Sequence, residues 1–124
     1  MKYYHLKYRL KMSHSVDNIK EHAHKHVLET EFYLKPVDES NMFAEFKDIE
    51  TNINNKLNVY QNRYLNEYPE FGADASLEHT GEAIYGMISD NLLDKNWKLV
   101  CFEISENPLR VYIIRDDDFD MRCI

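Results

Sequence analysis

Hydrophobic and polar residues alternate strictly near the start of the chain, from residue 3 to residue 14. Side chains at every second position of an extended strand share one face. One face of this segment carries lysine and arginine, and the other is apolar until it reaches His14. The apolar positions are Tyr4, Leu6, Tyr8, Leu10 and Met12. The pattern therefore predicts a β-strand with one buried face and a histidine at its end.

A second alternating segment follows the connection at residues 15–20 and begins in a run of histidines. Histidines stand at positions 22, 24 and 26, and the same parity continues with mostly apolar residues to position 34. In an antiparallel hairpin, the end of the first strand lies beside the start of the second. His14 is then expected to approach His24 and His26 over one shared face.

Three neutral imidazoles that leave a fourth position open form the ligand set of a catalytic zinc site. Parity and connectivity thus predict His14, His24 and His26 as metal ligands, without reference to any family. The alternative is a polar rim on a half-buried sheet. His22 has the same parity but lies one step further from the core, so we interpret it as a solvated or neighbouring histidine. Coordination by His22 in place of another histidine stays open.

Two segments in the middle of the chain repeat apolar residues at helical spacing. The first predicts a helix from about Ala44 to Asn58, after a break at residues 36–42. The second predicts a helix that starts near Ser76, a residue suited to an N-cap, and closes at residues 94–96. Both apolar stripes are interpreted as core.

Two more strands are predicted at residues 98–106 and 110–115, and the acidic residues 116–124 predict a frayed tail. The resulting β-β-α-α-β-β order predicts a single α+β domain over residues 1–124. Its four-stranded antiparallel sheet would carry both helices on one face. The other face must be buried by something else, so we expect a homo-oligomer.

The amino-acid composition excludes several classes of protein function. The 124 residues are 44% hydrophobic and 30% charged, as in ordinary globular proteins, and the net charge of -7 argues against nucleic acid as a partner. Neither a signal peptide nor a membrane span is expected, which predicts a cytoplasmic protein. Cys101 and Cys123 make no disulfide framework, and Cys101 is expected to be inert packing. Three glycines exclude a glycine-rich phosphate loop.

Five short motifs occur in a characteristic order, at residues 12–14, 24–26, 64–66, 76–79 and 102–108. They read Met-Ser-His, His-Lys-His, Tyr-Leu-Asn, Ser-Leu-Glu-His and Phe-Glu-Ile-Ser-Glu-Asn-Pro. Over residues 3 to 115 the chain resembles the 6-pyruvoyl-tetrahydropterin synthase and 6-carboxytetrahydropterin synthase family. His-Lys-His stands where that family has His-Gly-His.

The resemblance implies the tunnelling fold, in which sheets from several subunits join into a barrel, as trimers stacked into hexamers. It implies zinc held by three histidines. The implied substrate is 7,8-dihydroneopterin triphosphate or a related pterin, and some members act on the route to queuosine. Glu103 is implied as the pterin-anchoring carboxylate, because a carboxylate can accept two adjacent N–H donors. Glu78 would support the same site, or simply suit its helix dipole.

The chain also departs from this family. The family's cysteine before His-x-His is absent, and Gln61-Asn62 stand where it has an Asp-His pair, so neither can shuttle a proton in the same way. Glu21 is the available stand-in as general base beside zinc. One alternative is a catalytically degenerate homologue that binds a pterin without converting it. Another is a structural or metal-buffering module, which would not need Glu103.

Overall fold

The computed structural model describes residues 2–38 and 42–117. Its elements, in chain order, are β1 (Tyr4–His14), η1 (Lys20–His22), β2 (His24–Pro36), α1 (Met42–Asn58), β3 (Arg63–Tyr64), η3 (Leu65–Glu67), α2 (Leu77–Leu93), β4 (Trp97–Asn107) and β5 (Arg110–Arg115). The predicted order of long strands and helices is confirmed. From residue 118 onward the predicted tail, including Cys123, lies outside the described residues.

The strands form one sheet in the order β3-β1-β2-β4-β5. The four long strands pair antiparallel, as predicted. The fifth strand, β3, is an addition that runs parallel to β1 and pairs only with Met12 and Ser13. A strand of two residues is too short to show an alternating pattern, so it could not be predicted from periodicity.

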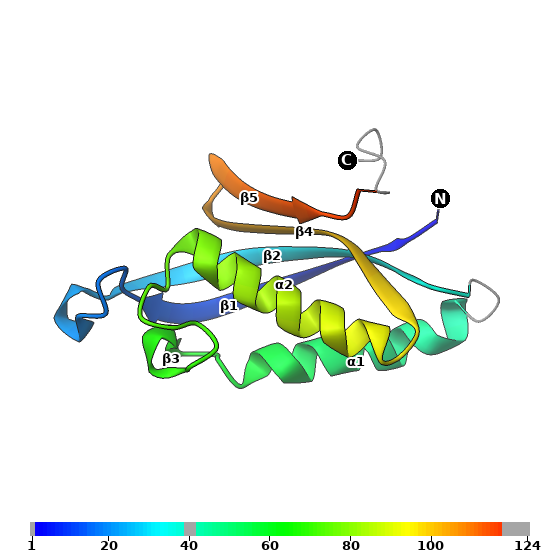
Figure 1. The fold of residues 1–124 in the computed structure, drawn as a ribbon, viewed down its shortest axis with the longest axis horizontal. Coiled ribbons are helices and arrows are strands. Elements are labelled where there is room, and N and C mark those ends of the chain that lie inside the picture. Colours follow the sequence, from blue (N-terminus) through cyan, green and yellow to red (C-terminus); the bar gives the residue numbers. More distant parts are fainter. Residues whose placement is uncertain (1, 39–41, 118–124) are drawn as a thin grey trace.

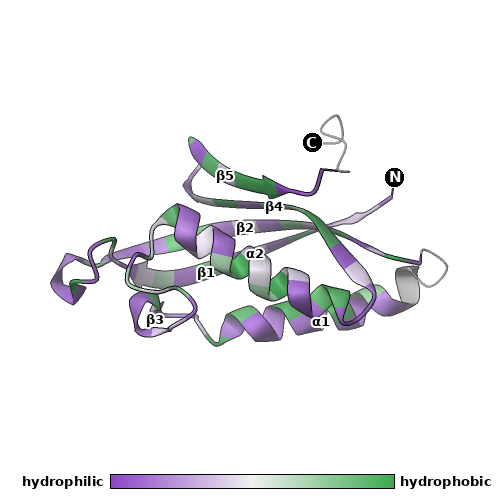
Figure 2. Cartoon of the chain, in the orientation of Figure 1, coloured by the Kyte–Doolittle hydropathy of each residue, from purple (hydrophilic) through white to green (hydrophobic). Residues whose placement is uncertain are grey.

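Both helices lie along one face of the sheet (Figure 1). The amphipathic character of α1 and α2 is visible as alternating green and purple turns in Figure 2. Their apolar side chains meet those of β1, β2 and β4 in one core, whose largest fully buried members are Trp97, Phe32 and Phe102. In the part of the chain that is described, no helix has the length and apolar character that a bilayer crossing requires.

The start of α2 is fixed in two ways. The Ser76 hydroxyl accepts a hydrogen bond from the His79 backbone N–H at 3.3 Å, as an N-cap should. One turn further, Gly81 lets the helix approach the sheet closely. A Cβ built there would lie 3.0 Å from Ile104 Cγ2 and 3.2 Å from Tyr112 Cδ2. These contacts hold the loop just before α2 against the end of the sheet.

The opposite face of the sheet carries a smaller apolar cluster of Tyr33, Val100 and Cys101, with Tyr3 packed against it. Beyond this cluster, Val111 and Ile113 of β5 are 45% and 46% exposed. This face is therefore partly apolar and is not covered by either helix.

Candidate metal centre

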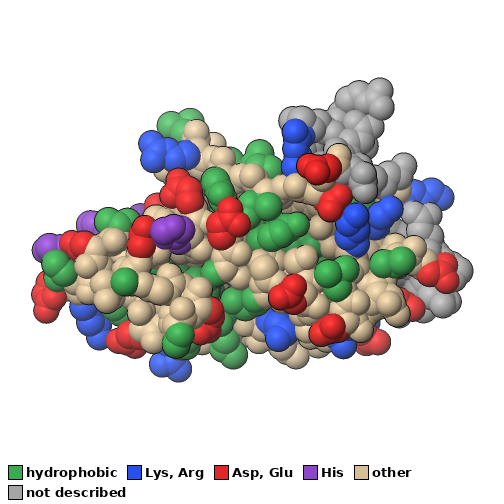
Figure 3. Space-filling view, viewed as in Figure 1, with side chains coloured by type: hydrophobic (Ala, Val, Ile, Leu, Met, Phe, Trp, Pro, Cys, Tyr) green, Lys and Arg blue, Asp and Glu red, His purple; other side chains and the backbone are tan. Residues whose placement is uncertain are grey.

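Strand pairing brings the three predicted histidines to one end of the sheet. His14 ends β1 and lies directly opposite His24, while His26 lies opposite Met12. Directly opposed residues share a face, so all three imidazoles lie on the face that the helices cover. The rings of His14 and His26 are 5.0 Å apart and nearly perpendicular, and those of His24 and His26 are 6.1 Å apart. Histidine side chains gather at this end of the molecule, next to acidic ones (Figure 3).

His14 is the anchored member of the group. Only 6% of it is exposed, and its Nδ1–H donates to the backbone carbonyl of Ala75, in the loop before α2. A carbonyl oxygen can only accept, so the hydrogen resides on Nδ1. In the neutral ring, Nε2 is left with a free lone pair. This is the tautomer and orientation that a metal-binding histidine needs.

Glu106 faces this lone pair. Its Oε1 lies 3.0 Å from His14 Nε2, and its Oε2 lies 3.9 Å from His26 Nε2. Ligand atoms of His14, His26 and Glu106 all lie within 4.8 Å of one another, close enough to hold one metal ion. His24 is outside this tight group and is exposed.

Glu106 lies at a β-bulge near the end of β4. Ser105 pairs with Val111 and Asn107 pairs with Arg110, so Glu106 is an extra residue in β4 relative to β5. Glu106 has the same parity as Phe102 and Ile104, whose side chains are buried under the helices, so its side chain lies on the face that carries the histidines. Glu106 was not among the predicted site residues. Its parity was a signal, because positions 102 and 104 are both buried in the core.

A cavity of about 270 Å³ opens beside the cluster. It is lined by His14, Val16, His24, His26, Ser76, Leu77, Glu78, Glu106, Asn107 and Arg110. Both His24 and the predicted substrate-binding Glu78 are thus adjacent to the group. A heterocycle in this cavity would contact carboxylates and imidazoles on the same wall as the candidate metal ligands.

Two other predicted site residues lie elsewhere in the chain's own structure. Glu103 pairs with Glu31 in the sheet and faces away from the histidines, where its Oε2 accepts a hydrogen bond from the Tyr33 hydroxyl at 2.7 Å. Burial and this carboxylate raise the pKa of Tyr33. Glu21 lies on the exposed η1 helix and is not among the residues that line the cavity.

His22 belongs neither to the His14–His26–Glu106 cluster nor to the residues that line the cavity beside it. Its Nδ1 lies 2.5 Å from Asp17 Oδ2, and both side chains are well exposed. The hydrogen bond with His22 lowers the pKa of Asp17. This pair closes the connection between β1 and β2 at a distance from the core, as expected for a solvated histidine.

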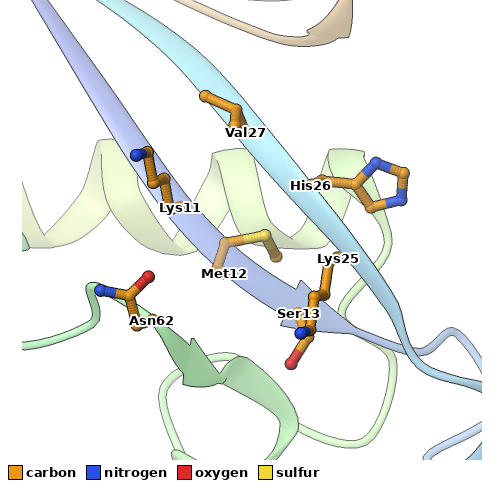
Figure 4. A pocket seen from close by; sticks show the side chains of 7 residues that line it. All are labelled: Lys11, Met12, Ser13, Lys25, His26, Val27 and Asn62. Atoms are coloured by element: carbon orange, nitrogen blue, oxygen red, sulfur yellow. The ribbon is translucent and has the colours of Figure 1, made fainter.

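A second cavity, of about 360 Å³, lies at the same end of the β1–β2 pair and is lined by Lys11, Met12, Ser13, Lys25, His26, Val27 and Asn62. Figure 4 shows the His26 ring turned away from Lys11 and Asn62. The lysines point from the sheet face opposite the histidines, in keeping with the alternation along β1 and β2. This cavity brings no second group of metal-ligating side chains to the histidines.

The fold and the histidine–glutamate cluster define a small α+β protein with a site able to hold a metal where its strands end. A sequence profile for 6-pyruvoyl tetrahydropterin synthase matches residues 3–117. The chain therefore belongs to the 6-pyruvoyl tetrahydropterin synthase family, as its motifs predicted. No curated protein sequence matches it.

Two solved structures are similar to this chain. The 6-pyruvoyl tetrahydropterin synthase of Caenorhabditis elegans is similar with a TM-score of 0.73 and 13% sequence identity, over 94% of this chain and 96% of that one. The enzyme of Plasmodium falciparum has a TM-score of 0.49 and 12% identity, over 92% of this chain and 98% of that one. At such identities the C. elegans structure supports the tunnelling fold.

Proposed function

We propose that this chain is a zinc-dependent pterin-binding protein of the tetrahydropterin synthase type, acting on 7,8-dihydroneopterin triphosphate or a related pterin. The observation that carries this proposal is the convergence of His14 and His26, with the His14 tautomer set by Ala75. The donor set of imidazole nitrogens suits zinc. His14, His24 and His26 would hold the ion. When bound, zinc would polarise oxygen atoms on the side chain of the substrate.

Pterin recognition is proposed to use carboxylates. Glu78 lines the cavity beside the histidines and is placed to accept N–H donors of a ring bound there. Glu103 faces away from that cavity in its own chain. As a pterin anchor it would therefore have to serve a site completed by another subunit. Its hydrogen bond with Tyr33 would hold its carboxylate in a fixed orientation.

Turnover would need a general base within reach of the substrate. Glu21 is proposed as general base, but its exposed position on η1 requires movement or a neighbouring subunit to reach substrate. Gln61 is occupied by three hydrogen bonds to β1, which is a structural task. These two observations favour the second candidate, a homologue that binds a pterin without synthase activity. Action on the route to queuosine belongs to the first candidate only.

A homo-oligomer, a trimer or hexamer in the cytoplasm, is part of the proposal. Val111 and Ile113 expose apolar surface on the uncovered sheet face, and β5 is an edge strand. Edge strands pair readily with another chain. A second copy of this chain is the occupant that the family's barrel would supply.

The decisive experiment combines metal analysis with a turnover assay. Purified protein should contain about one zinc per chain, and His14→Ala should contain none, with exposed His5→Ala as the matched histidine control. Incubation with 7,8-dihydroneopterin triphosphate and identification of the product separates a synthase from a binding homologue. Glu21→Gln should abolish turnover with zinc retained. Pterin titration of wild type and Glu103→Ala separates both candidates from a metal-buffering module, which would not bind pterin.

A further inference from the structure

We propose that the cavity of about 360 Å³ at the end of the β1–β2 pair binds a ligand that carries phosphate groups, held by Lys11 and Lys25. Both lysines point from the face of the sheet opposite the histidines. Neither is a proposed metal ligand, so the inference goes beyond the proposed function and does not depend on it. Figure 4 shows Lys11 on β1, Lys25 on β2 and Asn62 on the segment that leads into β3.

The first step is a ladder of ion pairs between β1 and β2 on the uncovered face. Lys7 lies opposite Glu31 and forms an ion pair with it, with 3.7 Å between Nζ and Oε1. Arg9, the next cation on β1, lies opposite Glu29, with 2.9 Å between Nε and Oε1. Opposite charges placed directly across two strands stabilise a sheet. Lys7 and Arg9 are thus each neutralised by a carboxylate on β2.

This ladder stops at the cavity. Lys11 continues the same face of β1, but its partner on β2 is Val27. Two positions further along β1, Ser13 lies opposite a second lysine, Lys25. The two lysines are therefore diagonal neighbours on one face, and within the described residues neither forms an ion pair. Because like charges repel, an anion that binds between the two ammonium groups would be stabilised by both.

Neutral hydrogen-bond donors complete the wall of the cavity. The Asn62 backbone N–H donates to the Lys11 carbonyl at 2.6 Å and thereby holds Asn62 beside β1. Asn62 has a positive φ of 60°, which asparagine adopts more readily than most residues. The Asn62 amide and the Ser13 hydroxyl both line the cavity, and each can donate a hydrogen bond to a bound oxygen.

The chemistry of this wall selects the class of ligand. Lysine ammonium groups only donate hydrogen bonds, and no carboxylate lines the cavity. A phosphate group carries up to two negative charges and three acceptor oxygens, so it can bind both ammonium groups at once. A carboxylate offers a single charge on two oxygens. On a chain with a net charge of -7, two neighbouring cations without partners form a local positive site for such an anion.

The test is isothermal titration calorimetry with inorganic triphosphate, on protein from which divalent cations have been removed so that no metal ion can bridge ligand and protein. Wild type should bind triphosphate. Lys11→Gln and Lys25→Gln should each weaken binding by about tenfold, and the double variant by about 100-fold, because each removes a charged donor. Asn62→Asp should also weaken binding, since it replaces a donor by a negative charge.

Lys7→Gln is the matched control for these variants. It removes the same charge from the same face of β1, but Lys7 is already paired with Glu31, so affinity should change by less than about twofold. Lysine acetylation mapped by mass spectrometry gives a second measurement. Triphosphate should protect Lys11 and Lys25 from the reagent and leave the reactivity of Lys7 unchanged.

The proposal is overturned if metal-free wild type does not bind millimolar triphosphate, or if the double variant binds it as tightly as wild type. Neither result would affect the metal site of the proposed function, because the assay contains no metal ion. 7,8-Dihydroneopterin triphosphate distinguishes two sources of phosphate. If it displaces inorganic triphosphate from wild type, the site receives the phosphate chain of a pterin; if it does not, the ligand is a free phosphate anion. Circular dichroism of each variant confirms that it is folded.

Discussion

His14 donates a hydrogen bond from Nδ1 to the backbone carbonyl of Ala75, a residue 61 positions further along the chain. The bond joins the end of β1 to the loop that leads into α2. Both residues are buried, with 6% and 0% of their surface exposed. A single contact thus orients a candidate metal ligand and fastens the wall of its cavity.

Replacing His14 by alanine should therefore affect both stability and metal response. With a metal chelator present, His14→Ala should lower the free energy of unfolding by about 1–3 kcal/mol. The reason is that the buried Ala75 carbonyl loses its hydrogen-bond donor. His24→Ala should change it by less than about 0.5 kcal/mol, since His24 is exposed. Added zinc should raise the melting temperature of wild type and leave that of His14→Ala unchanged. Urea unfolding and thermal scans measure these effects, and an equal zinc response in both proteins would contradict the role of His14.

The histidine pair was predictable because strand parity is a local property. The alternation that ends on His14, and the one that begins on His24, fix which face each ring occupies once a hairpin is assumed. The same reasoning applied to β4 would have favoured Glu106 over Glu103, because position 106 continues the buried parity of Phe102 and Ile104.

Other features of the structure could not be predicted from the sequence. The Ala75 carbonyl is a backbone group, so no residue type signals it. The two-residue β3 and the hydrogen bonds of Gln61 depend on the path of the chain after α1. That path cannot be predicted from periodicity, because a loop has no repeating pattern of apolar residues. The assembly of sheets into a barrel depends on contacts between chains.

The two glycines of α2 should respond in opposite ways to alanine. Nothing lies within 4 Å of a Cβ built on Gly86, so Gly86→Ala should stabilise the protein by about 0.5–1 kcal/mol through helix propensity. At Gly81 the new methyl would lie 3.0 Å from Ile104 Cγ2, and Ile104 is fully buried, so making room for the methyl would disturb the packed core. Gly81→Ala should therefore destabilise by about 1–2 kcal/mol. Equal effects in urea unfolding would show that α2 does not approach β4 this closely.

Gln61 should prove to be a stability residue. Its Oε1 accepts from the Lys11 backbone N–H at 3.0 Å, and its Nε2 donates to the Arg9 carbonyl at 2.7 Å and to the Tyr8 hydroxyl at 2.9 Å. The bonds to Lys11 and Arg9 provide hydrogen-bond partners for backbone groups on the edge of β1 that the short β3 does not reach. Gln61→Ala should cost about 1–3 kcal/mol of unfolding free energy, against less than about 0.5 for exposed Lys56→Ala. Undiminished stability with altered turnover would indicate a catalytic role instead.

Cys101 should be unreactive in the native protein. Burial, followed by the Glu103 carboxylate, raises the pKa of its thiol to about 11, so about one molecule in 1,000 carries the thiolate at pH 8. In a Cys123→Ser variant, iodoacetamide at pH 8 should label Cys101 slowly in buffer and rapidly in denaturant. Rapid native labelling, measured by mass spectrometry, would contradict the burial.

The raised pKa of Cys101 also makes the free energy of unfolding depend on pH. The folded state holds the thiol proton more tightly than the unfolded chain, in which the thiol has its ordinary pKa of 9.0. The resulting stabilisation is complete below pH 9 and is lost as pH rises toward 11. Cys101→Ala should therefore show a shallower decline in unfolding free energy over that window than its parent, although other groups titrate in both proteins.

Ile113 offers a test of assembly because it is 46% exposed on an edge strand, on the face opposite the helices. Exposed apolar side chains beside an unpaired edge favour association with another chain. If copies of this chain join sheets there, wild type should sediment as a trimer or hexamer, and Ile113→Arg should shift it to smaller species, because a buried unpaired charge is costly. Val59→Arg is the control, since Val59 is 57% exposed just after α1, away from β5. A monomeric wild type, or an Ile113→Arg variant of unchanged mass, would contradict assembly through this strand. Zinc binding measured in the same samples would then show whether the metal site needs the neighbouring subunit.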